Sequence, residues 1–318
     1  MNILRLKRAT LFCFGFAFFL FPGQSYYLTM PVEANTPIAS VVNINLPPPA
    51  LYPVNTTNIS PPALSAYSAI VLDYDSRVVM YGKNEKVWLL PASTVKIMTA
   101  LVSLEHYQDL EEVITVRNAS DAGQDMKLVA GERIRVKDLL YGLLVSSAND
   151  AASILAQNFP GGEESFVKAM NQKAFQLNLL DTYFANPTGL DSSEKGEILP
   201  DYSYTTAYDL ARLTAWALKN PIFSQIINTP EITVTDVDGR ITHRLFTINE
   251  LLGRVEGLKG VKTGWTEDAG QCFVSFTQRN NHSIITVILD SQDRFGETKK
   301  LIDWAFTNHE WQDLTPSI

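Results

Sequence analysis

The feature that most constrains the fold of this chain is a stretch from Ala92 to Tyr107 that would be apolar on almost every side of a helix. Its apolar residues leave no wide polar face: Val95, Ile97, Met98, Leu101, Val102 and Leu104. A helix that is hydrophobic all round has to be buried inside a fold. Other elements must therefore pack around residues 92–107, which predicts a substantial core.

Strand-like sequence lies near both ends of the chain. Apolar, β-branched runs at residues 68–73 and 77–81 flank a turn, and so do the runs at 271–277 and 283–289, which is the pattern of two hairpins. Helical patterns and short strand-like pieces lie between the hairpins, and a helix follows the second one. The helices are expected at residues 138–145, 149–158, 164–179, 206–219 and 293–308, and the short strands at 113–116 and 133–136.

This order predicts the fold class. Strands from both chain ends are most simply joined in one antiparallel sheet, with the intervening helical part as an insert. We therefore expect an α+β fold, an α/β sandwich in which helices flank the sheet and the mostly helical insert carries part of any site. Neither an internal repeat nor a second linker interrupts the folded part, which we place at residues 64–310 with a short tail at 311–318.

The N-terminal residues read as an export signal and a tether. Residues 1–25 contain three bases and no acid, then an apolar run at 11–21 and a small-x-small site, as in a secretory signal peptide. The run is shorter than the roughly 20 residues of a spanning helix, yet an uncleaved anchor stays an alternative. Residues 26–63 hold half of the 16 prolines and predict an extended, weakly structured tether.

Charge and cysteine content exclude several kinds of protein. The net charge of the whole chain is −8, and without the three bases of residues 1–25 it becomes −11. An acidic body argues against binding to nucleic acid or to an anionic membrane surface. Outside the signal, Cys272 is the only cysteine, which excludes an intrachain disulfide there. Its apolar neighbours predict a small buried hydrophobic residue.

The first sign of chemistry is Ser93-Thr94-Val95-Lys96 at the start of the buried helix. Residues three apart share a helix face, so the Lys96 amine can reach the Ser93 hydroxyl. Burial lowers the pKa of a lysine, which lets it act as a base near neutral pH. Alone, the pattern also fits an ordinary N-cap serine, and the chain contains two further Ser-x-x-Lys sequences.

Two more motifs follow in the chain. Ser147-Ala148-Asn149 interrupts an apolar helical pattern, where a hydroxyl could relay a proton and an amide could hold a lysine or a carbonyl. Lys262-Thr263-Gly264-Trp265-Thr266 precedes the last strands, where a glycine lets a ligand approach the backbone closely. Each alone reads as a turn, but the order of the three is that of penicillin-binding proteins and class A β-lactamases. Together they predict an active-serine acyltransferase.

The chain resembles the low-molecular-weight penicillin-binding proteins of the D-alanyl-D-alanine carboxypeptidase family from residue 66 to about residue 306. The resemblance rests on the sequences at residues 91–100, 186–191, 205–211 and 260–266. It implies that Ser93 is the nucleophile, Lys96 the general base and Ser147 the proton relay. The backbone N–H groups of Ser93 and Trp265 would form the oxyanion hole. Substrate binding is expected from Asn149, Lys262, Thr263, Gly264, Trp265 and Thr266.

The resemblance also implies a setting. The expected enzyme is a serine D,D-carboxypeptidase that removes the terminal D-alanine of peptidoglycan stem peptides and is acylated by β-lactams. It would need no cofactor or metal, would bind no nucleic acid, and would work as a monomer. We place it in the periplasm or at the outer face of the cytoplasmic membrane, where its N-terminus could tether it.

Departures from the family pattern leave alternatives. Many relatives carry Arg or Thr where this chain has Ile248, and Arg244 or Arg254 could substitute for it in binding the substrate carboxylate. Ala148 and the lack of a Glu-x-x-Leu-Asn segment disfavour a class A β-lactamase. A D,D-endopeptidase acting on crosslinks and a non-catalytic cell-wall-binding paralogue stay open. The four histidines show no metal-binding spacing and are expected in packing or surface roles.

Overall fold

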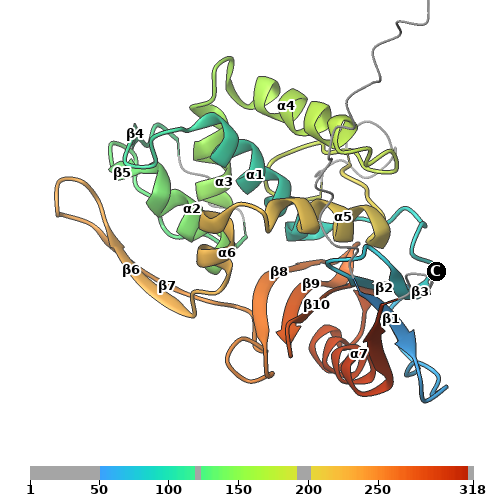
Figure 1. Cartoon of the computed structure of the whole chain (residues 1–318). Coiled ribbons are helices and arrows are strands. Elements are labelled where there is room, and N and C mark those ends of the chain that lie inside the picture. The colour runs from blue at the N-terminus through green and yellow to red at the C-terminus, as the bar shows by residue number, and fades with distance from the viewer. Residues whose placement is uncertain (1–50, 119–122, 192–201, 314–318) are drawn as a thin grey trace, which may run out of the picture. The chain divides into compact units, whose positions relative to one another are not determined.

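Five antiparallel strands from both parts of the chain form the central sheet, in the order β3-β2-β10-β9-β8 (Figure 1). The strands are β2 (Ser68–Asp73), β3 (Val79–Lys83), β8 (Leu258–Thr266), β9 (Gly270–Arg279) and β10 (His282–Ser291). The structure is a computed structural model that describes residues 51–118, 123–191 and 202–313. The predicted α+β fold, with one sheet built from both chain ends, is confirmed.

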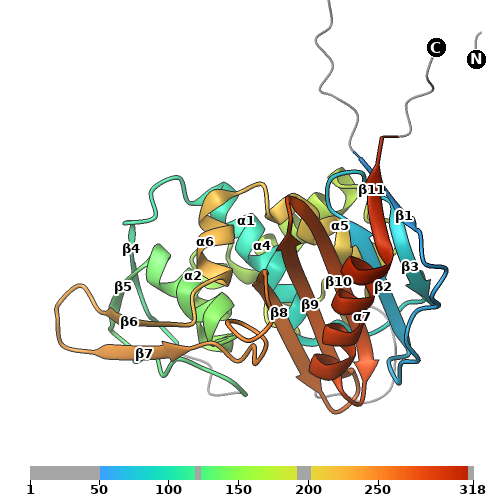
Figure 2. The same cartoon turned by 60° about the horizontal axis from the view of Figure 1, so that its bottom comes forward.

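The two faces of the sheet are buried against different partners. On β10, Ile284 and Ile288 pack with helix α7 (Arg294–Asn308), whereas the side chains of Ile285 and Val287 join the larger core on the other face. This alternation follows from the two-residue period of a strand. Figure 2 shows α7 lying along one face of the sheet. Both faces of the sheet are therefore buried, which explains why the sequences of its central strands are almost continuously apolar.

The helical insert covers the second face of the sheet. It begins with a 3₁₀ turn, η1, that leads directly into α1, the helix that the sequence predicts to be buried. Nine of the eleven residues of α1 are buried. The elements of this part are η1 (Ala92–Val95), α1 (Lys96–His106), β4 (Val113–Thr115), β5 (Arg133–Arg135), α2 (Val136–Val145), α3 (Asn149–Gln157), α4 (Gly162–Gln176), α5 (Ala207–Ala217) and α6 (Pro221–Ile227).

A long hairpin, β6 (Glu231–Thr235) with β7 (Thr242–Phe246), is an element that the sequence analysis missed. It contacts α2, its turn bonds to Arg133 of β5, and it extends past the helices in Figure 2. The Asp238-Gly239 dipeptide, which is typical of a tight hairpin turn, was the available sequence signal. The short helix α6 was missed too; Asn220 caps it by accepting from the backbone N–H of Ile222 (2.9 Å).

The predicted tether boundary at residue 63 is wrong. Strand β1 (Tyr52–Asn55) pairs with β11 (His309–Gln312), so the folded part begins earlier and ends later than predicted. Side chains strengthen this closure: the hydroxyl of Thr57 donates to Asn308 Oδ1 (2.6 Å), and the indole of Trp304 donates to the Ile59 carbonyl (2.9 Å). The proline-rich composition concealed a four-residue strand whose partner lies more than 250 residues away.

The predicted signal at residues 1–25, the first part of the tether and residues 314–318 lie outside the described residues. None of the helices within 51–118, 123–191 and 202–313 has the length and apolar content needed to cross a membrane. The described residues belong to one unit, Pro48–Ile318.

Removing β1 should destabilise the protein without unfolding it. A chain that starts at Leu64 loses the β1–β11 pair and the contacts of Thr57 and Ile59. Several net hydrogen bonds of about 0.5–1.5 kcal/mol each are lost, so we expect the melting temperature to fall by about 4–10 °C. Thermal unfolding followed by circular dichroism measures this, and a chain that starts at Leu51 is the control. Equal melting temperatures for the two chains would contradict the assignment of β1 to the folded body.

Candidate active site

Ser93 and Lys96 lie one turn apart where η1 leads into α1. The Lys96 Nζ atom is 2.8 Å from Ser93 Oγ, and the lysine is fully buried at 0 % exposure. Ala92 holds a left-handed backbone conformation (φ 46°) just before the serine. A non-glycine residue in that region costs about 1–3 kcal/mol and is held only by the surrounding structure. The contact predicted from the Ser-x-x-Lys spacing is therefore present.

The other partners of Lys96 determine how its amine can act. Nζ donates to the side-chain oxygen of Asn149 (2.6 Å) and to the backbone carbonyl of Thr188 (2.8 Å). Both of these oxygens can only accept. They take the two N–H bonds of a neutral amine and leave its lone pair for the third neighbour, the Ser93 hydroxyl. The arrangement thus suits an amine that receives a proton from Ser93.

Burial brings the Lys96 amine into the working range for a base. Desolvation lowers its pKa from 10.5 to about 7, against the opposing charge of Asp150. The second buried lysine, Lys262, has its pKa lowered well below 10.5, first by desolvation and then by the positive charges of Lys96 and Arg294. Two cations this close disfavour each other. The site therefore favours at least one neutral amine at pH 7.

A tight turn brings the Thr188 carbonyl to Lys96. The Asn186 side chain accepts from the backbone N–H groups of Thr188 (3.1 Å) and Gly189 (2.7 Å). Gly189 has φ 77°, and a Cβ there would lie 2.0 Å from the Ala92 carbonyl oxygen. Only glycine fits this close approach. The sequence at 186–191 supported the family resemblance, but the role of its carbonyl was not predicted.

Ser147 faces the second lysine from the junction between α2 and α3. Lys262 Nζ donates to Ser147 Oγ (2.8 Å) and to the carbonyl of Thr263 (2.8 Å). Ser147 also has a left-handed backbone (φ 63°). The predicted Ser-x-Asn motif is thus divided between the two lysines: Ser147 contacts Lys262 and Asn149 contacts Lys96.

Strand β8 lies at the edge of the sheet and carries the predicted Lys-Thr-Gly motif. A Cβ at Gly264 would lie 3.1 Å from the backbone nitrogen of Ser93. The glycine therefore lets β8 pass close to η1. Lys262 and Thr263 are buried, whereas the side chain of Trp265 is 64 % exposed.

These segments enclose a cleft of about 590 Å³. It is bordered by η1 and β8, by the loop before Asn149 and by the first residue of α7. Its described lining residues are Ser93, Gly123, Gln124, Ser147, Asn149, Leu190, Asp191, Ile248, Thr263, Gly264, Trp265, Thr266, Glu267 and Arg294. Lys96 and Lys262 lie directly behind it, through their bonds to Ser93 and Ser147.

Arg294 is the cation of this cleft that the sequence analysis missed. It begins α7, donates from Nη1 to the Gly264 carbonyl (2.7 Å), and leaves its buried Nε atom without a partner among the described residues. The alternatives chosen from the sequence, Arg244 and Arg254, are absent from the described lining, so that expectation is corrected. Ile248 does line the cleft. Arg294 lies outside every motif, and no local signal identified it.

The remaining chemical candidates fall outside this site. The thiol of Cys272 is fully buried, and desolvation raises its pKa to about 12, which fits the predicted role of a small apolar residue. Within the part of the chain that the structure describes, no group of three or more His, Cys, Asp or Glu side chains could hold a metal ion.

The fold and the site together define a class: a sheet-and-helix enzyme in which a serine is paired with a buried lysine. Residues 55–293 match the model of the D-alanyl-D-alanine carboxypeptidase family, peptidase S11. The chain belongs to this family, and it is a serine-type D-Ala-D-Ala peptidase.

Individual relatives carry different activities. A D-alanyl-D-alanine carboxypeptidase of Bacillus subtilis, DacF, is 32% identical over 88% of this chain and 72% of its own length. A D-alanyl-D-alanine endopeptidase of Pseudomonas aeruginosa is 33% identical over 85% of this chain and 84% of its own. The crystal structure of the Streptomyces K15 DD-transpeptidase superposes with a TM-score of 0.72 at 27% identity, covering 78% of this chain and 100% of that one.

The lowered pKa of Lys96 predicts a pH dependence. A neutral amine is needed to take the Ser93 proton, so the second-order rate constant for acylation by a β-lactam should rise with pH and be half-maximal near pH 7. Stopped-flow measurement between pH 5.5 and 8.5 tests this. His106→Gln, at an exposed position at the opposite end of α1 from Lys96, is the control and should leave the profile unchanged. A flat profile would contradict the role of Lys96 as the base.

Proposed function

We propose that this protein is a serine D,D-carboxypeptidase that removes the terminal D-alanine from peptidoglycan stem peptides. The observation that carries the proposal is the Lys96 amine, whose two carbonyl-type partners leave its lone pair for Ser93. In the first step Ser93 Oγ attacks the carbonyl carbon of the penultimate D-alanine and its proton passes to Lys96. The negative charge that forms on the substrate oxygen would be bound by the backbone N–H groups of Ser93 and Trp265.

The acyl-enzyme then forms as the peptide C–N bond breaks. The departing D-alanine amine needs a proton, and Ser147 is suited to deliver its hydroxyl proton because its oxygen already accepts from Lys262. Ser147 would be reprotonated by the proton that Lys96 took from Ser93, relayed through Lys262, which leaves Lys96 neutral again. A water molecule then attacks the carbonyl carbon of the Ser93 ester and passes a proton to Lys96, which returns it to Ser93 Oγ as the C–Oγ bond breaks and the shortened peptide leaves. β-Lactams would acylate the same serine and leave slowly. Losing one oxyanion donor typically costs about 10²–10³ in rate.

We assign the carboxylate of the terminal D-alanine to Arg294 and the Thr263 and Thr266 side chains. Arg294 supports this assignment because it lines the cleft together with Thr263 and Thr266 and is half-buried there. A charge-assisted hydrogen bond between a guanidinium and a carboxylate is among the strongest in proteins. Asn149 and the backbone of edge strand β8 would bind the peptide on the other side of the scissile bond.

A D,D-endopeptidase acting on crosslinks is the second candidate. The endopeptidase relatives of Pseudomonas aeruginosa and Escherichia coli support it, because this chain is 33% and 31% identical to them, about as similar as it is to the carboxypeptidase DacF at 32%. The same serine and lysine would serve both reactions. The difference lies in the group beyond the scissile bond, a free D-alanine or a second stem peptide.

We also propose that residues 1–25 export the protein, as a cleaved signal or as an anchor, and that residues from 26 to about 50 tether the catalytic unit. The acidic body and the basic, apolar N-terminal sequence support this placement outside the cytoplasm. The unit would act there on stem peptides as a monomer.

Product analysis tests the reaction. The unit from Leu51 onward is incubated with an acyl-D-Ala-D-Ala peptide and with a crosslinked muropeptide, and released D-alanine and lost crosslinks are measured separately. We expect free D-alanine, and we expect Ser93→Ala to abolish both this product and labelling by a fluorescent penicillin. Ser103→Ala is the matched control, since this buried Oγ on the same helix has no hydrogen-bond partner in the described structure. Loss of crosslinks without release of D-alanine would favour the endopeptidase. A wild-type protein that is not labelled by the fluorescent penicillin would contradict the proposal that Ser93 is a catalytic nucleophile.

Removing the Arg294 guanidinium should weaken substrate binding selectively. A hydrogen bond to a charged group contributes about 1.5–3 kcal/mol, so Arg294→Ala should raise KM about 10- to 100-fold for a peptide with a free C-terminal carboxylate. The matching peptide amide should be affected much less. Arg254→Ala, at an exposed position outside the described cleft lining, is the control. Equal losses for the acid and the amide would show that Arg294 only positions Gly264.

A further inference from the structure

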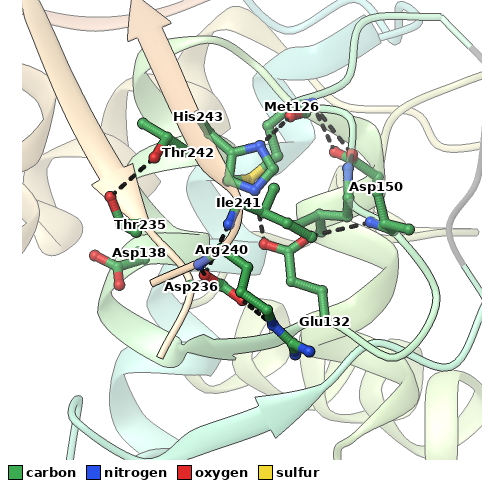
Figure 3. A network of polar contacts seen from close by, with 12 residues as sticks. Met126, Glu132, Asp138, Asp150, Thr235, Asp236, Arg240, Ile241, Thr242 and His243 are labelled. Atoms are coloured by element: carbon green, nitrogen blue, oxygen red, sulfur yellow. Dashed lines mark hydrogen bonds and ion pairs between the residues drawn. The ribbon is translucent and has the colours of Figure 1, made fainter. Parts of the chain in front are cut away.

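His243, on β7, contacts Met126 in the loop that leads from Gly123 and Gln124 of the cleft lining. Its Nδ1 atom lies 2.7 Å from the Met126 carbonyl oxygen, and its Nε2 atom lies 2.6 Å from Glu132 Oε1. Figure 3 shows the ring between these two partners. His243 and Glu132 are both buried, with 5 % and 2 % exposure. The sequence alone predicts only a packing or surface role for this histidine.

The partners of His243 determine where its protons lie. The Met126 carbonyl can only accept, so Nδ1 carries a hydrogen and donates it. One further proton lies between Nε2 and the Glu132 carboxylate, whichever of the two atoms holds it. The other oxygen of Glu132 accepts from the Val129 backbone N–H (3.0 Å). Because an unpaired buried polar group costs about 1–3 kcal/mol, these bonds hold the ring in one orientation.

Met126 is held from two sides by these contacts. Its carbonyl accepts from His243, and its N–H donates to both carboxylate oxygens of Asp150 (3.1 Å each). The Leu128 N–H also donates to Asp150 (3.0 Å). Residues 123–128, called here the cleft loop, are thus fixed between helix α3 and the β6–β7 hairpin (Figure 3).

The cleft loop reaches the reacting groups through Asn149. The backbone N–H of Asn149 donates to the Gln124 carbonyl (2.7 Å), and a Cβ at Gly123 would lie 2.8 Å from Asn149 Nδ2. Gly123 and Gln124 also line the cleft. Since Asn149 Oδ1 accepts from Lys96 (2.6 Å), a shift of this loop would move a partner of the lysine.

The hairpin that carries His243 is docked by other contacts as well. Asp236 accepts from the backbone N–H groups of Arg240 (2.6 Å) and Ile241 (2.9 Å), which fixes the turn. The Val237 N–H donates to the Arg133 carbonyl (2.7 Å), and the Arg133 side chain pairs with Asp238 (3.0 Å). These contacts with Arg133 do not involve His243, so a substitution of His243 leaves them in place. The effect of the histidine can therefore be measured separately from the docking of the hairpin on β5.

We propose that His243, supported by Glu132, is a positioning residue for the reaction at Ser93. It holds the cleft loop through Met126, so that Gln124 and Gly123 keep Asn149 against Lys96 and complete one wall of the cleft. The inference rests on the proposed function, because it assigns a part in acylation of Ser93 to a residue that does not touch the substrate. Misplacement of about 1 Å can cost about 10² in rate.

Three substitutions separate the two contacts of the ring. In His243→Asn the side-chain amide nitrogen can take the place of Nδ1 and donate to Met126, whereas in His243→Gln the amide sits near the place of Nε2 and can reach only Glu132. His243→Ala removes both. The measurement is the second-order rate constant for acylation by benzylpenicillin, expressed per active site after titration with a saturating labelled penicillin.

We expect His243→Ala and His243→Gln to react about 10- to 100-fold more slowly per active site, and His243→Asn to stay within about threefold of the wild type. Asp238→Asn, which loosens the hairpin at its ion pair with Arg133, is the control and should not change the rate per site. This readout is independent of how much protein is folded.

Two outcomes overturn the inference in distinguishable ways. If the wild type is labelled and all three His243 variants react at its rate per site, with only their melting temperatures lowered, the histidine has a structural role alone. If His243→Gln retains the rate and His243→Asn loses it, the contact with Glu132 and not with Met126 matters. A wild type that is not labelled at all contradicts the proposed function itself.

Discussion

The burial of the Lys96 amine is the constraint on which the rest of the site depends. A lysine with no exposed surface must find hydrogen-bond partners inside the protein, since desolvation of an unpaired ammonium costs several kcal/mol. Lys96 takes its partners from three separate segments, at Ser93, Asn149 and Thr188. The apolar helix α1 excludes water from the Lys96 amine. The hydrogen-bond acceptors that water would otherwise supply come instead from Thr188, in the turn at residues 186–191, and from Asn149, where α2 meets α3.

Backbone strain is concentrated at the same contacts. Ala92, which precedes Ser93, and Ser147, which binds Lys262, both adopt left-handed conformations (φ 46° and 63°). Such residues persist only where the surroundings determine the backbone. Here the surroundings are β8 and the 186–191 turn, whose glycines at 264 and 189 come within van der Waals distance of η1. The edge strand β8 therefore also fixes the position of η1, the segment that carries Ser93.

Hydrophobic periodicity and short residue spacings predict those features of this protein that depend only on residues close together in the sequence. The two strand pairs of the sheet, the buried helix and the Ser93–Lys96 contact follow from periodicity and from spacing three residues apart. Contacts between distant segments leave no such pattern. The β1–β11 pair joins the two ends of the unit, Arg294 enters the cleft only because α7 starts at the end of β10, and Thr188 contributes a carbonyl that every residue possesses. His243 reads as an ordinary packing residue until the fold brings Met126 and Glu132 to its two nitrogens.

The net charge of the whole chain does not describe the charges near the cleft, where Arg294 and two buried lysines lie close to Asp191 and Glu267. The net charge of −8 is spread over the chain, and exposed charges are screened beyond about 8 Å at physiological ionic strength. Lys262 is buried, as Lys96 is, and Arg294 is half-buried, so any positive charge that these groups carry is much less screened than an exposed charge. A charged group close to β8 would therefore experience Arg294 and a protonated lysine more strongly than it would experience distant surface acids. Desolvation lowers the pKa of both lysines, so the burial that weakens screening at the site also favours a neutral amine at Lys96.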